Sequence, residues 1–408
     1  MERWNTACLV AGGGPAGMML GYLLARSGVR TILAEKHGDF FRDFRGDTVH
    51  PSTTEILQEL GLLDEFLTAV PHHAVEQLGI GFKGVTYDLI DFRHLPTTCK
   101  YVAFMPQWDF LNFLADHARR YPTLRLEMNT EVTGLLYDGD RIIGAAAETP
   151  GGPVEIRADL TVACDGRWSV LRDQSGLPLK EYRMPIDVLW FRLPRSRSAP
   201  ETLGYLGSGQ IILAINRGDY WQCGAIIGKD TFDEVQAEGL AAFRTKLATT
   251  APFLTASLNA LTDWDQVKLL SVAANRLRRW WLPGLLCIGD AAHAMSPVGG
   301  IGVNYAVADA VAAANAVALP LRDGRLTEKN LRAVQNRRKP PTTLAQTLQN
   351  AQTANLARIS RTEPPLWMLR LLSRSEPMKR MLGRVMGLGF RREHIRTPEL
   401  QAGSATSG

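Results

Sequence analysis

The sequence predicts an α/β protein with an inserted, mainly β part and a helical C-terminal segment. Residues 6–36 have the pattern of strand, glycine-rich turn, helix and strand. Residues 185–230 hold several short alternating strands, and residues 327–390 have a helical pattern. Of the 408 residues, 45% are hydrophobic and 21% charged, which is typical of a globular protein with two or three domains.

The glycine-rich turn indicates a dinucleotide site. An apolar strand at 6–11 leads into a G-x-G-x-x-G at 12–17, and an apolar strand at 29–34 ends in Glu35. Gly12 permits the turn, Gly14 lets backbone N–H groups approach a pyrophosphate, and Gly17 lets the helix pack on the strand. Glu35 is placed to accept hydrogen bonds from a ribose, which makes NADP the least suitable dinucleotide at this site.

Helices and strands alternate through residue 166. We expect a helix at 52–67 with a capping box of Ser52 and Glu55, and a helix at 107–120. Strands are expected within 75–103 and 124–148, with a turn at 138–140. A further apolar strand at 158–163 ends in Cys164, Asp165 and Gly166.

The middle block is rich in strands, and helices follow it. Strands are expected at 188–193, 210–215, 221–227, 267–276 and 285–288, and helices at 232–249, 302–319 and within 327–390. Aromatic residues on these strands either line a pocket or pack in the core: Trp190, Phe191, Tyr220 and Trp221. Trp280 and Trp281 are expected to pack the junction between the two parts.

Composition excludes several classes of protein. The five cysteines share no C-x-x-C spacing, so we expect reduced, buried thiols in a cytoplasmic protein and no metal site. The most apolar stretch, 306–321, is interrupted by Asp309, Asn315 and Pro320, so no transmembrane helix is expected. The net charge of +5 belongs to residues 357–397, where ten Lys and Arg face three Asp and Glu; nucleic-acid binding is therefore not implied.

A second glycine-rich stretch, GDAAHAMSPVGGIGVNYAVADA at 289–310, identifies the cofactor. A strand ends at Asp290, a loop with Pro297, Gly299 and Gly300 follows, and then a helix begins. Asp290 can accept hydrogen bonds from a sugar-alcohol chain, and backbone N–H groups at 300–303 would face an anionic ring edge. FAD has both a ribityl chain and such a ring, whereas NAD has neither.

Three motifs in order resemble those of the single-component FAD-dependent aromatic hydroxylases, the monooxygenase family typified by para-hydroxybenzoate hydroxylase. They are the first glycine turn with Glu35, the Asp-Gly motif at 164–172, where Cys164 replaces the commoner alanine, and residues 289–310. The resemblance covers about residues 5–345. It implies a Rossmann-type FAD-binding domain at 1–73, 102–178 and 276–350, a substrate-binding β-sheet domain at 74–101 and 179–275, and a C-terminal helical segment at 351–408.

The resemblance also implies roles for individual residues. Glu35 would hold the adenosine ribose, Asp290 the ribityl chain, and Val132 the adenine through its backbone. Arg45 and Gln107 would contact the phosphates and ribityl region, Pro297 would lie near the flavin ring and substrate, and Asp165 would support both FAD and the nicotinamide nucleotide. The complete predicted cofactor set is Gly12, Gly14, Pro15, Ala16, Gly17, Glu35, Lys36, Arg45, Gln107, Val132, Asp165, Gly289, Asp290, Pro297, Gly299, Gly300, Gly302, Val303 and Asn304.

The implied activity is that of a monooxygenase that uses NADH or NADPH and O2. The flavin C4a-hydroperoxide would hydroxylate an aromatic or polyketide-like small molecule. The alternatives are a flavin-dependent reductase or epoxidase acting on a prenyl or other lipophilic substrate, and a protein that holds FAD without turnover. A halogenase is disfavoured because G-W-x-W-x-I-P is absent.

Catalytic residues and partners are less well defined by the sequence. No catalytic base is assigned: His293 is expected to be structural, and His50, His72 and His73 to be surface or loop histidines. We expect a monomer or homodimer. The basic C-terminal segment is expected to cover the FAD or substrate domain, with a membrane surface as the alternative partner.

Overall fold

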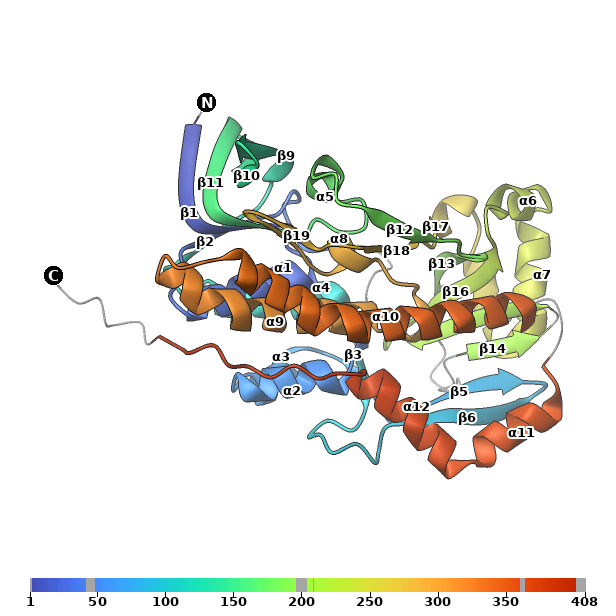
Figure 1. Ribbon diagram of the computed structural model, residues 1–408. Coiled ribbons are helices and arrows are strands. Elements are labelled where there is room, and N and C mark those ends of the chain that lie inside the picture. Colours follow the sequence, from blue (N-terminus) through green and yellow to red (C-terminus); the bar gives the residue numbers. More distant parts are fainter. Residues whose placement is uncertain (1, 42–47, 196–203, 208, 360–363, 401–408) are drawn as a thin grey trace.

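A computed structural model describes residues 2–41, 48–195, 204–207, 209–359 and 364–400 (Figure 1). Within these residues a larger, mostly parallel sheet lies beside a smaller sheet, and long C-terminal helices run along both. This arrangement confirms the predicted α/β fold with an added β-sheet and a helical C-terminal part.

In the part of the chain that the structure describes, the larger sheet has eight strands in the order β19-β20-β11-β1-β2-β8, with β10 and β9 continuing from β11. The pairs β11–β20, β1–β11, β1–β2 and β2–β8 are parallel. The strand bounds are β1 Glu2–Ala11, β2 Thr31–Ala34, β8 Leu124–Glu127, β9 Glu131–Asp138, β10 Arg141–Thr149, β11 Gly152–Ala163, β19 Trp281–Leu282 and β20 Leu285–Cys287.

The alternation of side chains along β1 gives this sheet two covered faces. Cys8 and Val10 pack against three helices, α1 (Pro15–Arg26), α4 (Gln107–Ala118) and α9 (Gly302–Arg322). Leu9 and Ala11 point the other way, into a cluster with the β9–β10 hairpin and Trp280. The first strand and the glycine turn that follows it are therefore held from both sides.

The smaller sheet has seven strands over the described residues, in the order β17-β13-β16-β15-β14-β5-β6. Its bounds are β5 Gln77–Phe82, β6 Val85–Asp91, β13 Ile186–Pro194, β14 Gly204–Gly207, β15 Gln210–Asn216, β16 Tyr220–Gly228 and β17 Lys268–Leu270. One face packs on helix α7 (Leu240–Thr250), through Leu189 and Phe191 of β13. The opposite face, with Val188 and Trp190, faces the interior between the two sheets.

The C-terminal helices are α10 (Glu328–Ile359), α11 (Leu366–Arg374) and α12 (Glu376–Leu388). Helix α10 packs on α9 and spans the width of the molecule in Figure 1. The segment Val298–Arg322, which contains α9, has the length and hydropathy of a membrane span, but 67% of its most apolar window is buried inside the protein. We therefore interpret α9 as a core helix.

Shorter elements complete the fold. They are the three-stranded sheet of β3 Thr48–Val49, β7 Val102–Phe104 and β4 His73–Val75; the pair β12 Leu179–Tyr182 and β18 Ala274–Leu277; helices α2 Pro51–Glu59, α3 Leu63–Ala69, α5 Val170–Gln174, α6 Phe232–Ala237 and α8 Asp290–His293; and 3-10 turns at Pro252–Leu254, Ser257–Ala260, Trp264–Gln266 and Val298–Gly300.

The predictions for one capping box, two helices and one strand were wrong. The capping box of Ser52 and Glu55 is absent, because α2 begins one residue earlier at Pro51, after His50, and Glu55 pairs with Arg392 instead. The helices expected at 52–67 and 232–249 are each two helices, since Gly61 and Gly239 adopt positive φ. The strand expected at 267–276 divides into β17 and β18, because the N–H of Val272 is held by Asp187 outside the ladder.

The prediction of reduced, buried thiols is confirmed: Cys8, Cys99, Cys164, Cys223 and Cys287, all within the described residues, are free and buried. Burial raises the pKa of the Cys8, Cys223 and Cys287 thiols, so these groups stay neutral in the core. Trp280 and Trp281 were expected at the junction between the two parts, but the structure places them in the two clusters on opposite faces of the larger sheet.

His50 is not the surface histidine that the sequence suggested. Its side chain is fully buried, its Nδ1–H donates to the Met386 carbonyl at 2.9 Å, and Nε2 has no hydrogen-bond partner within the described residues. Burial lowers the pKa of His50 to about 4, against 6.5 for an ordinary histidine. The folded protein therefore holds His50 neutral.

Acidification should destabilise the protein through His50. Between pH 6.5 and 4 the unfolded chain binds the proton and the folded chain does not, so stability present above pH 6.5 is lost as the pH falls. The loss approaches about 3 kcal/mol near pH 4. His50→Asn retains an N–H at the Nδ1 position. In this variant the free energy of unfolding, measured with denaturant at several pH values, should fall less steeply with decreasing pH than in the parent. An equally steep fall in both proteins would contradict this assignment.

Candidate active site

A cavity of about 510 Å³ lies where the two sheets meet. Its lining includes the first glycine turn, the Asp-Gly motif, the loop at 295–300 and the interior face of the smaller sheet. The three motifs are far apart in the chain. The parallel order β20-β11-β1 brings the ends of their strands to one edge of the larger sheet, where ligands bind in open α/β sheets.

The first turn is shaped by close backbone approach. Gly12 has a φ of 101°, and a Cβ there would lie 2.5 Å from the Cys164 carbonyl oxygen. A Cβ on Gly17 would overlap the Gly12 carbonyl oxygen, so glycine is needed for α1 to pack on the turn. Gly14 differs, because among the described residues no atom beyond its chain neighbours lies within 4 Å of its Cβ position, and the residue borders the cavity.

Two helix N-termini open onto the cavity. Helix α1 begins after Gly14, and α9 begins after Ile301; within the described residues neither end has a side-chain cap or an acidic residue in its first turn. The cavity lining includes Pro15 and Ala16 of α1, and Gly302 and Val303 of α9. Unpaired N–H groups and the positive end of the helix dipole favour an anion at each position.

Glu35 lies at the end of β2, 7% exposed, and borders the cavity. Its Oε2 accepts from the N–H of Gly13 at 2.8 Å and its Oε1 accepts from the N–H of His37 at 3.1 Å. These bonds fix the carboxylate beside the glycine turn, and a carboxylate has acceptor capacity beyond them for a ribose hydroxyl. Lys36 lies at the rim, 3.8 Å from Glu131.

The Asp-Gly motif forms the neighbouring wall. Asp165 accepts from the Ser169 hydroxyl and from the N–H of Leu171 at 3.2 Å. Burial raises the pKa of Asp165, and the Ser169 hydrogen bond acts against the rise. Arg167 lies 3.8 Å from Asp290 and so joins the second motif to the third. Trp168, 70% exposed, lies at the cavity rim.

The third motif is supported by a buried ionic cluster. The N–H of Gly289 donates to Asp309 at 3.1 Å, and Asp309 also contacts His293 and, at 2.8 Å, Arg338. Burial opposes ionisation of Asp309, but the charges of His293 and Arg338 outweigh it and hold the pKa of this carboxyl below its usual value. His293 is 1% exposed and does not border the cavity, which supports a structural role.

Most of the predicted cofactor residues border one cavity: Gly12, Gly14, Pro15, Ala16, Glu35, Lys36, Gln107, Val132, Asp165, Asp290, Pro297, Gly299, Gly300, Gly302 and Val303. Gly17, Gly289 and Asn304 lie behind its wall. Asn304 accepts from the N–H of His50 at 2.9 Å and from the Thr53 hydroxyl at 2.7 Å, so its carbonyl holds α2 against α9. Arg45 lies outside the described residues.

The part of the cavity formed by the smaller sheet is apolar. Its strands present alternate residues to the interior, so the wall is built from Leu78, Ile186, Val188, Trp190, Ile211, Leu213, Ile215, Ile226 and Leu270. Leu356 of α10 and Met386 of α12 close it from the C-terminal side. Trp190 is thus a cavity residue, whereas Phe191 and Trp221 are core residues. None of these described wall residues carries a titratable side chain.

Sequence reasoning missed several lining residues. Gly13, Gly166, Arg167 and Trp168 lie inside the recognised motifs, and their motif positions were the available signal. Thr48, whose hydroxyl donates to the Gly300 carbonyl at 2.9 Å, and Phe40 come from the segments flanking 42–47. Nothing in their local sequence separates them from ordinary loop residues.

The site fits FAD. A long cavity with two uncapped helix N-termini, a carboxylate at the end of β2 and another at Asp290 matches the pyrophosphate, ribose, ribityl chain and ring edge of that cofactor. The sequence profile of the FAD binding domain family matches residues 5–347. The chain therefore belongs to this family, and its fold and relatives make it an FAD-dependent monooxygenase of the aromatic hydroxylase type.

Several relatives are named as monooxygenases or hydroxylases. The chain is 30% identical over 386 residues to 6-methylpretetramide 4-monooxygenase of Streptomyces rimosus, an alignment that covers 93% of this chain and 92% of that protein. The crystal structure of Pseudomonas aeruginosa PqsL in complex with 2-aminobenzoylacetate superposes with a TM-score of 0.74 at 22% identity, covering 86% of this chain and 97% of that one. The structure of anhydrotetracycline hydroxylase from Streptomyces rimosus superposes with a TM-score of 0.76 at 22% identity, covering 94% of this chain and 76% of that one.

Proposed function

We propose that this enzyme hydroxylates an aromatic, polyketide-like small molecule of fused rings, with NADH or NADPH as reductant and O2 as the oxygen source. The observation that carries the proposal is the apolar wall from Leu78 to Leu270, a sheet face that lines the same cavity as the loop that contains Pro297. A planar polycyclic substrate buries a large apolar area on such a face, at roughly 25 cal/mol per Å². The similarity to a 6-methylpretetramide monooxygenase favours the same substrate class.

FAD, when bound, supplies the redox chemistry, with oxygen transfer through its C4a-hydroperoxide. The chain positions the cofactor and substrate and excludes water. The N-termini of α1 and α9 would hold the anionic groups, Glu35 a ribose, and Asp290 the ribityl chain. The apolar wall and the covering side chains of Leu356 and Met386 keep the substrate end of the cavity dry.

The wall also constrains the substrate. Because none of its described residues titrates, it offers no base to deprotonate a phenol. A substrate suited to such a wall carries a ring hydroxyl that is already acidic, for example one conjugated with a carbonyl. Fused-ring polyketides of the phenolic type have this chemistry, whereas an isolated alkene does not.

The direct test is NAD(P)H oxidation by the purified holoenzyme, measured with and without O2 against fused-ring phenols, single-ring phenols and a prenyl compound. We expect oxidation to rise with a fused-ring phenol and labelled oxygen from 18O2 to enter the product. Anaerobic turnover that gives a saturated product would replace the proposal with a reductase. Oxygen insertion into the prenyl alkene alone would replace it with an epoxidase.

A cavity variant should separate substrate binding from cofactor binding. Leu213→Trp adds bulk to the apolar wall, so we expect KM for the fused-ring substrate to rise by about tenfold or more while flavin content is unchanged. The control is Leu269→Trp on β17, where the side chain is 44% exposed and next to wall residue Leu270. Equal kinetics in the two variants would place the substrate elsewhere.

A further inference from the structure

The outward faces of α11 and α12 carry large apolar side chains where a surface helix normally carries polar ones. Trp367 is 68% exposed, Leu371 62% and Met381 52%. Trp367, Leu371 and Arg374 follow the i, i+4, i+7 spacing of one helical face. Exposed apolar groups gathered on adjoining helices mark an interaction surface more often than single exposed residues do.

The inward faces of the same helices are tightly packed, so this exposure is a fixed feature of the fold. A Cβ on Gly383 would overlap the Asp91 carbonyl oxygen, which shows how closely α12 approaches the end of β6. Leu369 of α11 and Leu388 of α12 are 3% and 4% exposed and belong to the core cluster behind the cavity wall. Each helix thus has one apolar side already buried and a second apolar side exposed.

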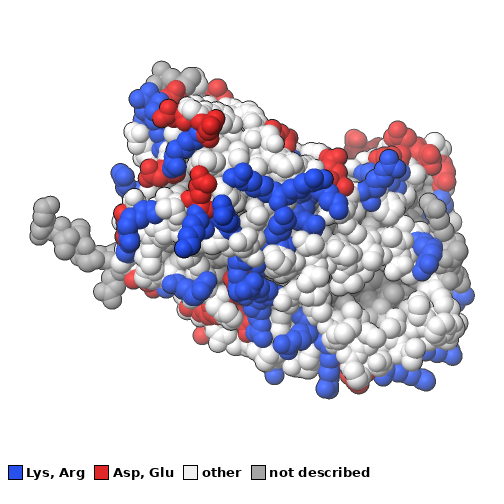
Figure 2. Space-filling view, viewed as in Figure 1, with Lys and Arg blue, Asp and Glu red and all other residues white. Residues whose placement is uncertain are grey.

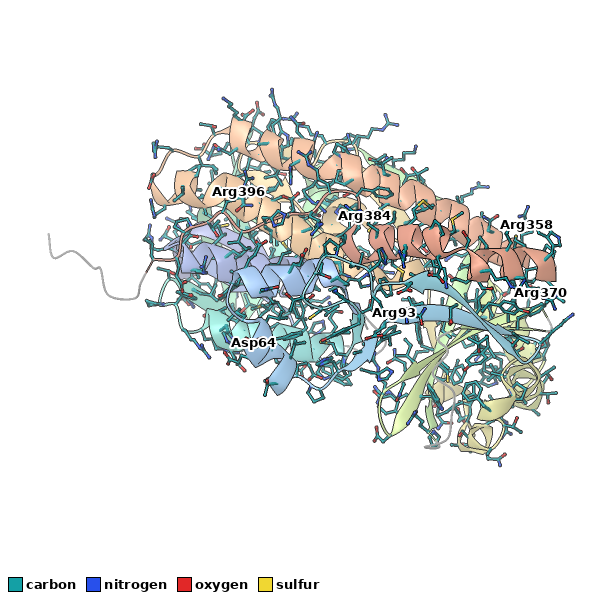
Figure 3. All side chains as sticks on the ribbon, turned by 90° about the horizontal axis from the view of Figure 1, so that it is seen from below. Asp64, Arg93, Arg358, Arg370, Arg384 and Arg396 are labelled. Atoms are coloured by element: carbon teal, nitrogen blue, oxygen red, sulfur yellow. The ribbon has the colours of Figure 1, made fainter. Side chains whose placement is uncertain are left out.

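Positive charge accompanies the exposed apolar groups. Arg370, Arg374, Arg380 and Arg384 are exposed, and no carboxylate among the described residues forms an ion pair with them. Glu376, the acidic residue of α12, pairs with Lys379. Figure 2 shows Lys and Arg outnumbering Asp and Glu around the lower right, where Figure 1 places α11 and α12. In the view from below, Arg384 of α12 is labelled near the centre and Arg370 of α11 at the right (Figure 3).

We propose that the α11–α12 face, formed by Trp367, Leu371 and Met381 with Arg370, Arg374, Arg380 and Arg384, docks on an anionic lipid bilayer. Exposed tryptophan and aliphatic side chains beside arginine have the chemistry of the membrane interface, where the apolar groups enter the acyl boundary and the guanidinium groups contact lipid phosphates. A second copy of the chain fits less well, because two such faces would bring at least eight arginines together.

The location of this face adds a functional reason. Met386 of α12 borders the apolar end of the cavity together with Leu356 of α10, so one of the two helices that would lie on lipid also forms part of the cover of the substrate site. A lipophilic fused-ring substrate partitions into membranes. Docking through α11 and α12 would place the cavity cover next to that pool of substrate.

The test is co-sedimentation of the purified holoenzyme with vesicles. One set is made of phosphatidylcholine alone and the other contains about one-third phosphatidylglycerol. We expect binding to the anionic vesicles to exceed binding to the neutral ones by at least about tenfold, and to fall as salt is raised from 0.05 to 0.5 M. Equal sedimentation with both vesicle types, or with neither, would overturn the proposal.

Variants separate the two components of the face. The triple variant Trp367→Ser, Leu371→Ser, Met381→Ser and the quadruple variant Arg370→Gln, Arg374→Gln, Arg380→Gln, Arg384→Gln should each lower the partition coefficient about tenfold or more. The quadruple Arg→Lys variant keeps the charge and should bind. Leu344→Ser, at a 55% exposed site on α10, should bind like the parent.

Flavin content and thermal melting check that each variant is folded, since these side chains point outward. Light scattering without lipid checks self-association. Undiminished vesicle binding by both multiple variants would overturn the proposal. So would a dimer that dissociates in the triple serine variant, because the face would then be an interface between two copies of the chain. The proposal would be supported if binding to anionic vesicles is salt-sensitive, is lost in the triple serine and quadruple glutamine variants, and is retained in the quadruple lysine variant.

Discussion

Replacing Gly14 with valine is expected to leave the fold intact and to weaken FAD binding by at least about tenfold, or 1.4 kcal/mol. Gly14 has a φ of −70°, which any residue adopts, and in the described part of the chain no atom beyond its neighbours in sequence lies within 4 Å of its Cβ position. The new side chain would instead project into the cavity at the N-terminus of α1. It would occupy the space that the pyrophosphate of FAD needs to reach the backbone N–H groups.

The measurement is the flavin-to-protein ratio after desalting, followed by titration of the flavin-free protein with FAD. Thermal unfolding of the flavin-free forms should be nearly the same for Gly14→Val and the parent. The control is Gly151→Val on the turn between β10 and β11, where the nearest atom to the Cβ position is 3.6 Å away, in ordinary contact. A Gly14→Val protein with full flavin content would show that the pyrophosphate does not lie at this helix terminus.

Gly17→Ala makes a contrast, because it acts on the protein itself. Its Cβ would overlap the Gly12 carbonyl oxygen, so α1 would have to move off the glycine turn. The flavin-free Gly17→Ala protein should unfold at a lower temperature than flavin-free Gly14→Val. The two glycines belong to one sequence motif, yet one makes space for a ligand and the other makes space for a helix.

The motifs could be predicted because each is local. The strand, the turn at 12–17 and Glu35 are fixed by spacing within one strand–helix–strand unit, and the structure brings Gly14 and Glu35 to the same cavity. The parallel sheet then follows from the alternation of strands and helices. The same holds for 289–310, where the strand end, the loop and α9 are consecutive in the chain.

The sequence did not reveal the role of residues whose contacts lie far away in the chain. Asn304 belongs to the third motif, but its contacts are His50 and Thr53, more than two hundred positions away, and spacing does not reveal them. The residues of the apolar wall could not be predicted from the sequence either. Both faces of β13 are apolar, with Val188 and Trp190 toward the cavity and Leu189 and Phe191 toward α7, so residue type does not distinguish wall from core.

Asp309→Asn is expected to destabilise the folded protein by about 3–5 kcal/mol, the range for removing one partner of a buried ion pair. Asp309 is fully buried and contacts His293 and Arg338, whose side chains are each 1% exposed. Arg338 would keep Glu393, 3.3 Å away, but would lose the neutralising charge at 2.8 Å. Denaturant unfolding at pH 7 measures the change.

The pH dependence of the free energy of unfolding tests whether the loss of the Asp309 charge causes this destabilisation. Its pKa in the fold lies below the ordinary value of 3.8, so its stabilising contribution is complete above that pH and is lost as the pH falls through the folded-state pKa. The difference in free energy of unfolding between the parent and Asp309→Asn should therefore become smaller below pH 3.8. Asp323→Asn is the control, since Asp323 pairs with Arg322 and Arg325 at the surface and its loss should matter far less.

The same variant tests whether the ionic cluster serves the cofactor. Asp309 accepts a hydrogen bond from the N–H of Gly289, and the next residue, Asp290, borders the cavity. If this bond is weakened and Gly289 shifts, Asp290 should shift with it, and so should the predicted contact to the ribityl chain. We expect Asp309→Asn to retain less FAD than the parent at a temperature where both are folded. Loss of stability with unchanged FAD affinity would confine the cluster to structural support. Loss of both would show that α9 anchors Asp290 through a charge buried behind the cavity wall.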